Sequence, residues 1–231
     1  MNYRIGALLV CSITIGICGC NDEDTKVAPP STGIYADYQV MGEEGREGVT
    51  IRAQFRSGGP NGPALTLAPP ASVALDGEPL QGDSIGKVGT FYEVQKRLDE
   101  FGGDHRIDFR DEKGNLASTG FDFLPFTLSP LPPSIGRGDL QFPLSGLEEG
   151  APVHVILTDT SFASNDINSI DTIRAGKLVI SEERLHDLRS GPIQLQLISE
   201  REEPIRRNGK RVGKLTRSYS LHREFLLASD R

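Results

Sequence analysis

Apolar and polar residues alternate along most of the chain, and this alternation predicts β-strands. The clearest example is residues 49–56, VTIRAQFR, where every second residue is apolar. A period of two places one set of side chains on a buried face and the other in solvent. Weaker versions occur at 34–40, 72–75, 91–98, 105–109 and 116–123, with turn residues between them. We therefore expect an antiparallel β-sandwich that ends near residue 124.

A second series of strands is expected in the C-terminal half, at 140–144, 153–157, 177–180, 193–197, 200–206 and 215–227. Asn208-Gly209 is a strong signal for a tight turn between the last two segments. Residues 181–188 begin with Ser181 and acidic residues, a pattern that predicts one or two helical turns. The short strands and the size of each half, about 100 residues, are typical of Ig-like sandwiches. The expected fold class is all-β, with two tandem Ig-like antiparallel β-sandwiches.

The two halves are separated by residues 124–133, LPFTLSPLPP, which include four prolines. Proline does not fit the middle of a sheet, so this segment is the best domain boundary. Phe126, Leu128 and Leu131 are too apolar for a free linker, and we expect a short, packed hinge. We expect a leader at residues 1–19 and a tether at 20–32. The first sandwich then covers 33–124, the hinge 125–133 and the second sandwich 134–231.

The N-terminus reads as an export signal. One side-chain cation, Arg4, precedes the uncharged, mostly apolar residues 5–17. This run is shorter than the roughly 20 residues of a membrane-spanning helix and has the length of a signal-peptide core. It ends in Ile17-Cys18-Gly19-Cys20, which resembles the lipobox of bacterial lipoproteins. The resemblance implies that Ile17, Cys18 and Gly19 are recognised by a signal peptidase, and that Cys20 carries the lipid. The alternatives are an ordinary secretory signal, or an uncleaved anchor with incidental cysteines.

Lipidation would account for all three cysteines of the chain. Cys11 and Cys18 would leave with the leader and Cys20 would be capped, so the folded part would hold no disulfide and no cysteine-based metal site. Membrane attachment through the lipid on Cys20 follows, in a bacterial cell envelope. Residue 21 is Asn, without the Asp that resembles an inner-membrane retention signal, and Asp22-Glu23-Asp24 resembles a short surface-export signal. We expect the outer membrane, with the protein facing the periplasm or the surface.

Composition and motifs exclude several classes of function. The formal net charge is −7, which is not that of a general nucleic-acid binder. The four histidines lack zinc-site spacing, and the chain has neither a nucleophile elbow nor a phosphate-binding loop. We therefore predict no catalytic residues, no metal and no cofactor, and a non-catalytic binding or assembly module with a protein or glycan partner in the envelope. The alternative is an envelope hydrolase for glycan or peptide, with Asp/Glu or Ser/His residues converging from separate loops.

Two segments remain as candidate sites. Residues 165–171, NDINSID, offer oxygen ligands for Ca²⁺ but lack the glycine and late glutamate of an EF-hand, so we expect a polar loop. The second candidate is basic, and it consists of Arg206, Arg207, Lys210, Arg211 and Lys214 around the predicted hairpin turn. These cations could contact an anionic partner such as lipid head groups or acidic glycan. Alternatively, they protect the hairpin from edge-to-edge pairing, which is the interpretation we favour.

Overall fold

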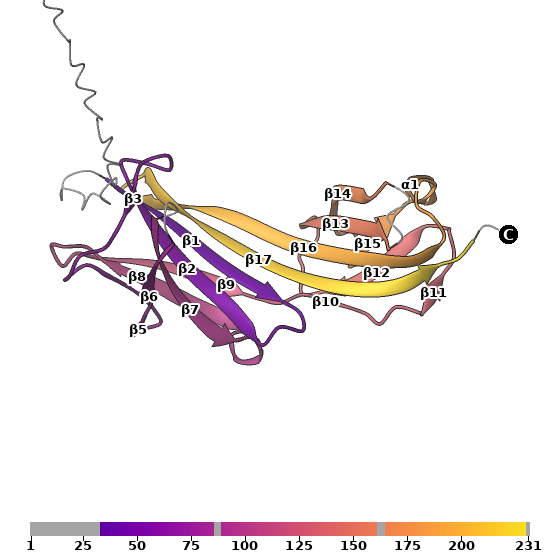
Figure 1. The fold of residues 1–231 in the computed structure, drawn as a ribbon, viewed down its shortest axis with the longest axis horizontal. Coiled ribbons are helices and arrows are strands. Elements are labelled where there is room, and N and C mark those ends of the chain that lie inside the picture. Colours follow the sequence, from indigo (N-terminus) through magenta and orange to yellow (C-terminus); the bar gives the residue numbers. More distant parts are fainter. Residues whose placement is uncertain (1–32, 86–88, 161–164, 230–231) are drawn as a thin grey trace, which may run out of the picture.

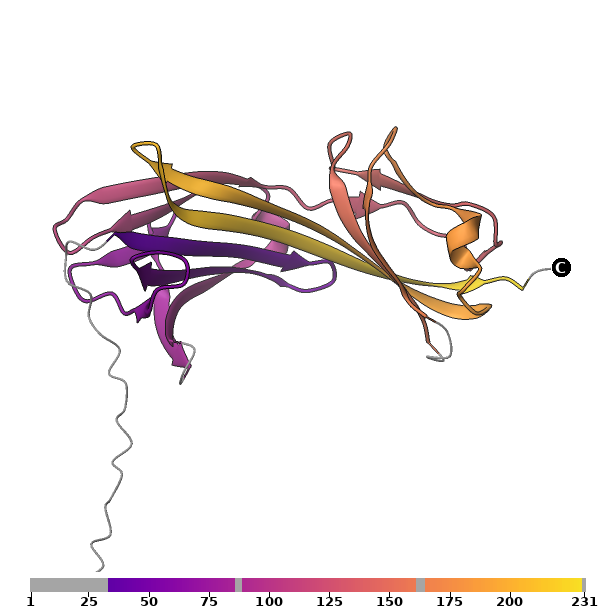
Figure 2. The same cartoon turned by 90° about the horizontal axis from the view of Figure 1, so that it is seen from above.

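A computed structural model describes residues 33–85, 89–160 and 165–229 of the chain. The fold is almost entirely β, and its strands form two sandwiches placed one after the other along the long axis (Figures 1 and 2). Ile17, Cys18, Gly19, Cys20 and the tether to residue 32 lie outside the described residues. Within the described part, no helix has the length and apolar character required to cross a membrane.

The first sandwich has the strand order of an Ig-like domain. One sheet runs β1 (Ile34–Glu43), β2 (Gly48–Ser57), β7 (Gly89–Arg97) and β6 (Gln81–Ile85), with β3 (Ala64–Leu65) also on β2. The facing sheet runs β5 (Glu78–Pro79), β4 (Ser72–Leu75), β8 (Gly103–Arg110) and β9 (Leu116–Phe123). A 3₁₀ turn, Leu98–Glu100, leads from β7 toward β8. When the strands are lettered in chain order, the first sheet has the spatial order A-B-E-D and the facing sheet C′-C-F-G, as in the Ig arrangement.

The second sandwich repeats the arrangement. Its smaller sheet is β10 (Thr127–Leu128), β12 (Leu140–Ser145) and β15 (Lys177–Ile180). The facing sheet contains β14 (Ile167–Thr172), β13 (Pro152–Asp159), β16 (Gly191–Arg207) and β17 (Lys210–Leu227), with β11 (Ser134–Ile135) parallel to β17. The expected short helix is α1, Glu182–Leu185. The predicted fold class, all-β with two tandem Ig-like sandwiches, is confirmed.

The long hairpin of β16 and β17 joins one sheet of the first sandwich to one sheet of the second, so that the two form a single continuous sheet. These strands are 17 and 18 residues long, about 60 Å if fully extended at roughly 3.3 Å per residue. In the second sandwich β16 pairs with β13, and farther along β17 pairs in parallel with β1, from Ala36 with Gly213 to Glu43 with Ser220. The turn at Asn208-Gly209 therefore lies at the far end of the first sandwich (Figure 1). The sequence division assigned the hairpin to the second domain, yet its outer half completes the first.

Aromatic side chains fill the junction between the sandwiches. Phe126, from the proline-rich segment, is fully buried, and its ring lies edge-on to Tyr219 of β17 at 5.5 Å. Tyr219 also meets Phe123 of β9, with ring centroids 6.2 Å apart. The segment between the sandwiches is thus packed against the long hairpin and does not hang free.

Arg217 ties the hairpin to the facing sheet beside this junction. Its side chain is buried, with 8% of the residue exposed, and one of its terminal nitrogens donates to the main-chain oxygen of Asp122 at 2.7 Å. The guanidinium also bonds the carboxylates of Asp122 and Glu203. Burial works against ionised Asp122, but the hydrogen bond and charge of Arg217 outweigh it and hold the pKa of that carboxyl below its usual range.

Candidate functional site

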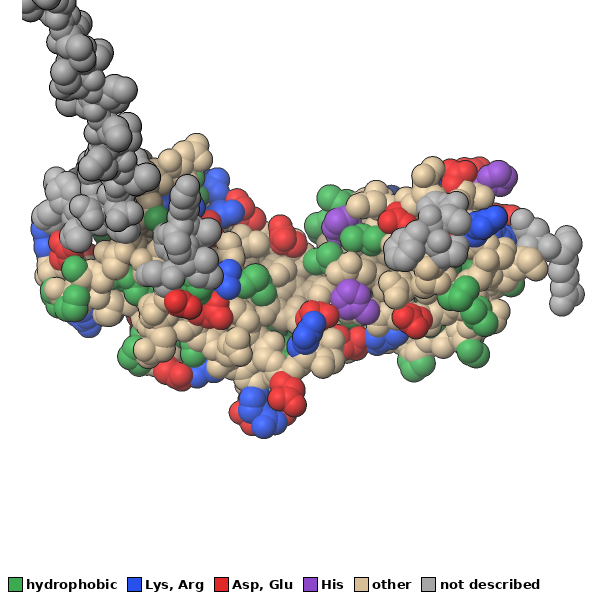
Figure 3. Space-filling model, in the orientation of Figure 1, with side chains coloured by type: hydrophobic (Ala, Val, Ile, Leu, Met, Phe, Trp, Pro, Cys, Tyr) green, Lys and Arg blue, Asp and Glu red, His purple; other side chains and the backbone are tan. Residues whose placement is uncertain are grey.

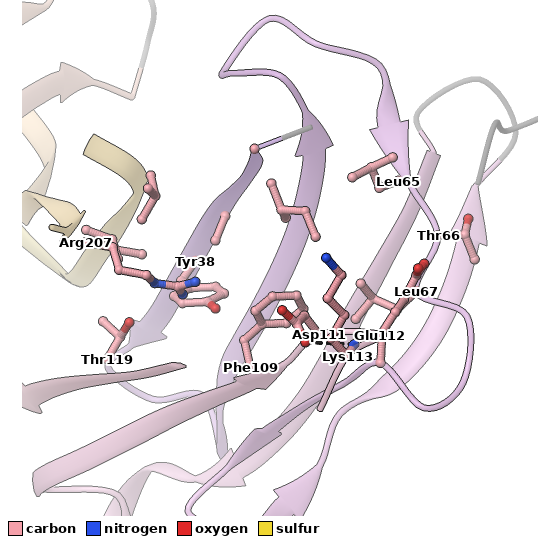
Figure 4. A pocket seen from close by; sticks show the side chains of 16 residues that line it. Tyr38, Leu65, Thr66, Leu67, Phe109, Asp111, Glu112, Lys113, Thr119 and Arg207 are labelled. Carbon is pink, nitrogen blue, oxygen red and sulfur yellow. Dashed lines mark hydrogen bonds between the residues drawn. The ribbon is translucent and has the colours of Figure 1, made fainter. Parts of the chain in front are cut away.

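A pocket of about 270 Å³ opens between the two sheets of the first sandwich, at the end where the described chain begins. Its walls come from β1, from the segment after β3, from the β8–β9 turn and from the tip of the long hairpin (Figure 4). The hairpin tip is a wall only because β17 pairs with β1. The pocket is therefore built by both halves of the chain.

The floor of the pocket is apolar. Leu65 and Phe109 are almost fully buried, and Ile34, Leu67, Ile205 and Val212 also belong to the apolar lining. Phe109 stacks obliquely on Phe55 at 4.8 Å between ring centroids, which fixes the floor to the core of the first sandwich. A volume close to the lower end of small-molecule sites, about 300–1,000 Å³, together with an apolar floor, suits a small ligand.

One wall of the pocket carries a tyrosine hydroxyl beside a cation. Tyr38 of β1 is only 2% exposed, and its hydroxyl makes no hydrogen bond with any residue in the described ranges. Arg207, at the end of β16, places its guanidinium next to this ring (Figure 4). Burial raises the pKa of Tyr38, and the nearby positive charge of Arg207 offsets this only in part. The hydroxyl therefore remains a proton donor at neutral pH.

The opposite rim consists of the β8–β9 turn. Lys113 extends its ammonium group into the pocket (Figure 4). The carboxylate of Asp111 accepts hydrogen bonds from the main-chain nitrogens of Lys113 and Asn115, at 2.9 and 2.8 Å, and from the Asn115 side chain. The Asn115 bond, offset in part by desolvation, lowers the pKa of Asp111. Asp111 is therefore a turn-stabilising carboxylate and a poor candidate for a general acid.

The structure separates the five basic residues of the predicted hairpin site. Arg211 and Lys214 both pair with Glu202, with nitrogen–oxygen distances of 2.9 and 3.1 Å, on the side of the hairpin that faces Tyr35. Arg206 lies at the turn, where it reaches the main-chain oxygen of Gly209 at 3.5 Å. Lys210 begins β17, while Arg207 borders the pocket. On the face seen in Figure 3, positive and negative side chains are interspersed over both sandwiches.

The polar loop predicted at 165–171 is for the most part a strand, because Ile167–Thr172 forms β14 on the edge of the second sandwich. Successive side chains of a strand point to opposite faces, so the polar side chains do not converge as a calcium loop would require. The Asn168 oxygen lies 2.6 Å from a ring nitrogen of His154. Asp171 forms an ion pair with Arg184 at 2.9 Å.

His105, on β8 of the first sandwich, also has structural partners. His105 stacks on Phe101 at 3.8 Å between ring centroids, and one of its nitrogens lies 2.8 Å from an Asp76 oxygen. Across the parts of the chain that the structure describes, no group of three or more His, Cys, Asp or Glu side chains could hold a metal ion.

Sequence reasoning missed the pocket and the special position of Tyr38. Tyr38 sits in a weakly alternating segment, and nothing in that pattern distinguishes a core tyrosine from one that faces a cavity. Only the basic cluster signalled this region, and of its five members Arg207 alone reaches the pocket.

Comparison with known proteins gives no family for this chain. No protein-family model matches it, and no curated protein does. Among solved structures, the tetra-tandem repeat in the extending region of a large adhesion protein aligns with 83% of this chain at 14% identity and a TM-score of 0.26. That alignment spans 50% of the adhesion-protein chain. The IG1 and IG2 domains of DIP-gamma align with 85% of this chain and 99% of their own, at 9% identity and a TM-score of 0.23. With TM-scores this low, the assignment of the fold rests on the strand pairing described above.

Proposed function

We propose that this protein is a lipid-anchored, non-catalytic binding module of a bacterial cell envelope. The observation that carries the binding role is the pocket of the first sandwich, where an apolar floor, the hydroxyl of Tyr38 and a solvent-exposed arginine meet. Convergent polar groups above an apolar floor are the usual composition of a small-molecule site. The anchor is supported by the lipobox resemblance at Ile17-Cys18-Gly19-Cys20.

The position of the chain entry supports an orientation for the anchored protein. Gly33, the first described residue, borders the pocket, and its main-chain oxygen accepts a hydrogen bond from Gly58 at 2.8 Å. A tether of residues 20–32 spans at most about 45 Å at roughly 3.5 Å per residue. The proposal therefore keeps the pocket end near the membrane and directs the second sandwich away from it.

The proposed location is the outer membrane, with the protein facing the periplasm or the cell surface. Asn21 directly follows the proposed lipidated cysteine, and the acidic residues Asp22-Glu23-Asp24 come next. The lack of Asp at position 21 and the acidic run at 22–24 both support the outer membrane.

The anchor is tested by cysteine substitution in cells. Cys20→Ala should abolish incorporation of radiolabelled palmitate and release the protein from the membrane fraction, since the thiol is the only group proposed to take the lipid. Globomycin should block processing of the unsubstituted protein. Cys18→Ala is the matched control, because alanine is also small and should leave labelling and processing intact. Unchanged palmitate labelling of the Cys20→Ala protein would refute the anchor.

A second candidate contact is an anionic surface at the hairpin tip. Arg206, Arg207 and Lys210 form no ion pair within the described residues, whereas Arg211 and Lys214 are held by Glu202. The tip also lies at the end where the described chain begins (Figure 1). Reversing the charges of Arg206 and Lys210 to Glu should reduce sedimentation with anionic vesicles and leave the melting temperature nearly unchanged. Equal sedimentation of the two proteins would exclude this contact.

A further inference from the structure

We propose that the pocket of the first sandwich binds a small carboxylate ligand with an apolar body, held by Arg207 and the hydroxyl of Tyr38. This inference rests on the proposed binding role and names the ligand class. It does not depend on the lipid anchor.

The hydroxyl of Tyr38 is available for a hydrogen bond at the pocket. Among the fully enclosed side-chain polar atoms of the described residues, those without a hydrogen-bond partner belong to Asp37 and Arg217, so the Tyr38 hydroxyl is not sealed in the core. The Tyr38 side chain as a whole is almost entirely buried, but its hydroxyl, which has no hydrogen-bond partner in residues 33–85, 89–160 and 165–229, is reached from the pocket. A ligand acceptor in the pocket would satisfy it.

Arg207 and Lys113 bring positive charge to the pocket. Arg207 makes no ion pair or hydrogen bond within the described part of the chain, and its guanidinium lies beside the Tyr38 ring (Figure 4). A guanidinium presents parallel N–H donors that match the two oxygens of a carboxylate, and the neighbouring hydroxyl adds a third donor. Lys113 reaches in from the opposite rim and adds a second positive charge.

The acidic rim and the volume of the pocket limit the charge and the size of the ligand. Asp111 and Glu112 share the rim with Lys113, so a dianion such as a phosphate monoester would meet two negative charges. A carboxylate has a single charge. The apolar floor of Leu65, Phe109 and Ile205 then takes a short alkyl or aryl body, and the volume of about 270 Å³ limits its length.

The probe for this site is 3-phenylpropionate, measured by saturation-transfer difference NMR on the full-length protein in detergent. Its neutral counterpart, 3-phenylpropanol, and its dianionic counterpart, phenyl phosphate, are titrated in parallel. We expect 3-phenylpropionate to bind about tenfold more tightly than either, because a charge-assisted bond is made only to the carboxylate and the dianion is repelled.

Two substitutions test the assigned groups. Arg207→Gln should weaken 3-phenylpropionate binding about tenfold or more, and Tyr38→Phe about fivefold, while neither should change 3-phenylpropanol binding. Tyr38→Phe should keep the melting temperature, since the hydroxyl it removes has no protein partner within the described residues. Arg174→Gln is the control, because Arg174 is an exposed arginine of the second sandwich outside the pocket lining, and this variant should bind as the unsubstituted protein does.

Three results would overturn the proposal: no saturation transfer to 3-phenylpropionate, equal binding of the acid and the alcohol, or unchanged binding in both pocket variants. Equal binding of 3-phenylpropionate and 3-phenylpropanol would mean that the pocket is an apolar cavity without preference for a carboxylate. Because palmitate labelling and membrane fractionation are read separately, a failure here is distinguishable from a failure of the anchor.

Discussion

At the residue scale, neighbouring positions on β1 show how strand register determines the surroundings of a side chain. Tyr38 points between the sheets toward the pocket, whereas Asp37 points the other way, toward Lys214 of β17. Asp37 has one carboxylate oxygen that is buried and makes no hydrogen bond within the described residues, and Lys214 is 3.9 Å from the other oxygen. Lys214 is closer to Glu202, at 3.1 Å, so the carboxylate of Asp37 is incompletely compensated.

This environment gives a pH-dependent prediction. Burial raises the pKa of Asp37, partly opposed by the positive charge of Lys214. A carboxyl with a raised folded-state pKa binds its proton more tightly in the folded state, so its ionisation costs stability as the pH rises from about 3.8 through the raised value. Asp37→Asn removes this cost. The free energy of unfolding of the variant, relative to the unsubstituted protein, should therefore increase as the pH rises.

The measurement is urea unfolding of both proteins between pH 3 and pH 7. Other titrating groups are common to the two proteins and largely cancel in the difference. A difference that does not change with pH would show that Asp37 ionises in the folded protein as easily as in the unfolded chain.

At the element scale, the long hairpin covers the edge strand β1 of the first sandwich. In an Ig-like arrangement strand A is a sheet edge, and an exposed edge can pair with another chain. Here β17 covers β1 along eight residue pairs, from Ala36 with Gly213 to Glu43 with Ser220. The hairpin also creates a new edge, because β13 pairs with β16 only from Ile193 to Ile198, and residues 199–207 pair with β17 alone among the described strands. Protection of this edge by the basic residues stays a prediction.

Close approach of β17 to β1 requires a glycine at position 213. A Cβ atom there would lie 2.3 Å from the Ala36 carbonyl oxygen, closer than any real contact, and main-chain atoms cannot rotate away. Gly213→Ala should lower the free energy of unfolding by about 1–3 kcal/mol through overpacking. It should also increase hydrogen exchange at the main-chain amides of residues 36–43, because the pairing with β17 loosens.

Gly138→Ala is the control for this substitution, since a Cβ at position 138 meets no atom within 4 Å. Its unfolding and exchange should match those of the unsubstituted protein. Protection of β1 that stays unchanged in Gly213→Ala would mean that the parallel pairing does not hold this edge in solution.

At the scale of the whole molecule, the two sandwiches share strands as well as a boundary. β16 and β17 contribute to both sandwiches, and Phe126 and Tyr219 fill the space where these meet. Independent Ig-like domains on a free linker unfold separately, whereas domains that share paired strands lose both sets of contacts together. We expect a single calorimetric unfolding transition for the whole protein.

Ser199→Pro tests this coupling at the junction. Ser199 pairs with Tyr219, and a proline there removes a backbone donor and disturbs the ladder between β16 and β17. The stability should fall by about 2–3 kcal/mol and the single transition should separate into two. Ser199→Thr keeps the donor and favours a strand, so it should retain one transition. One undivided transition in the proline variant would show that the aromatic junction alone couples the sandwiches.

The sequence by itself determined the class of the fold, because alternation of apolar and polar residues is a local property with a period of two. It predicted β2 from VTIRAQFR, the turn at Asn208-Gly209 and the short helix after Ser181. It did not indicate β14, whose side chains read NSID without apolar alternation, because that strand is held by its pairing with β13. Edge strands of this kind depend on a partner more than on their own pattern.

Only the tertiary structure decided where the hairpin lies and what it builds. The pairing of Gly213 with Ala36 joins residues about 180 positions apart, and no local pattern encodes which edge a strand covers. The same long-range pairing brings Arg207 to Tyr38 and closes one wall of the pocket. The sequence therefore showed a cluster of cations and a tyrosine on a predicted strand. That Arg207 and Tyr38 lie side by side depends on the strand register between distant segments.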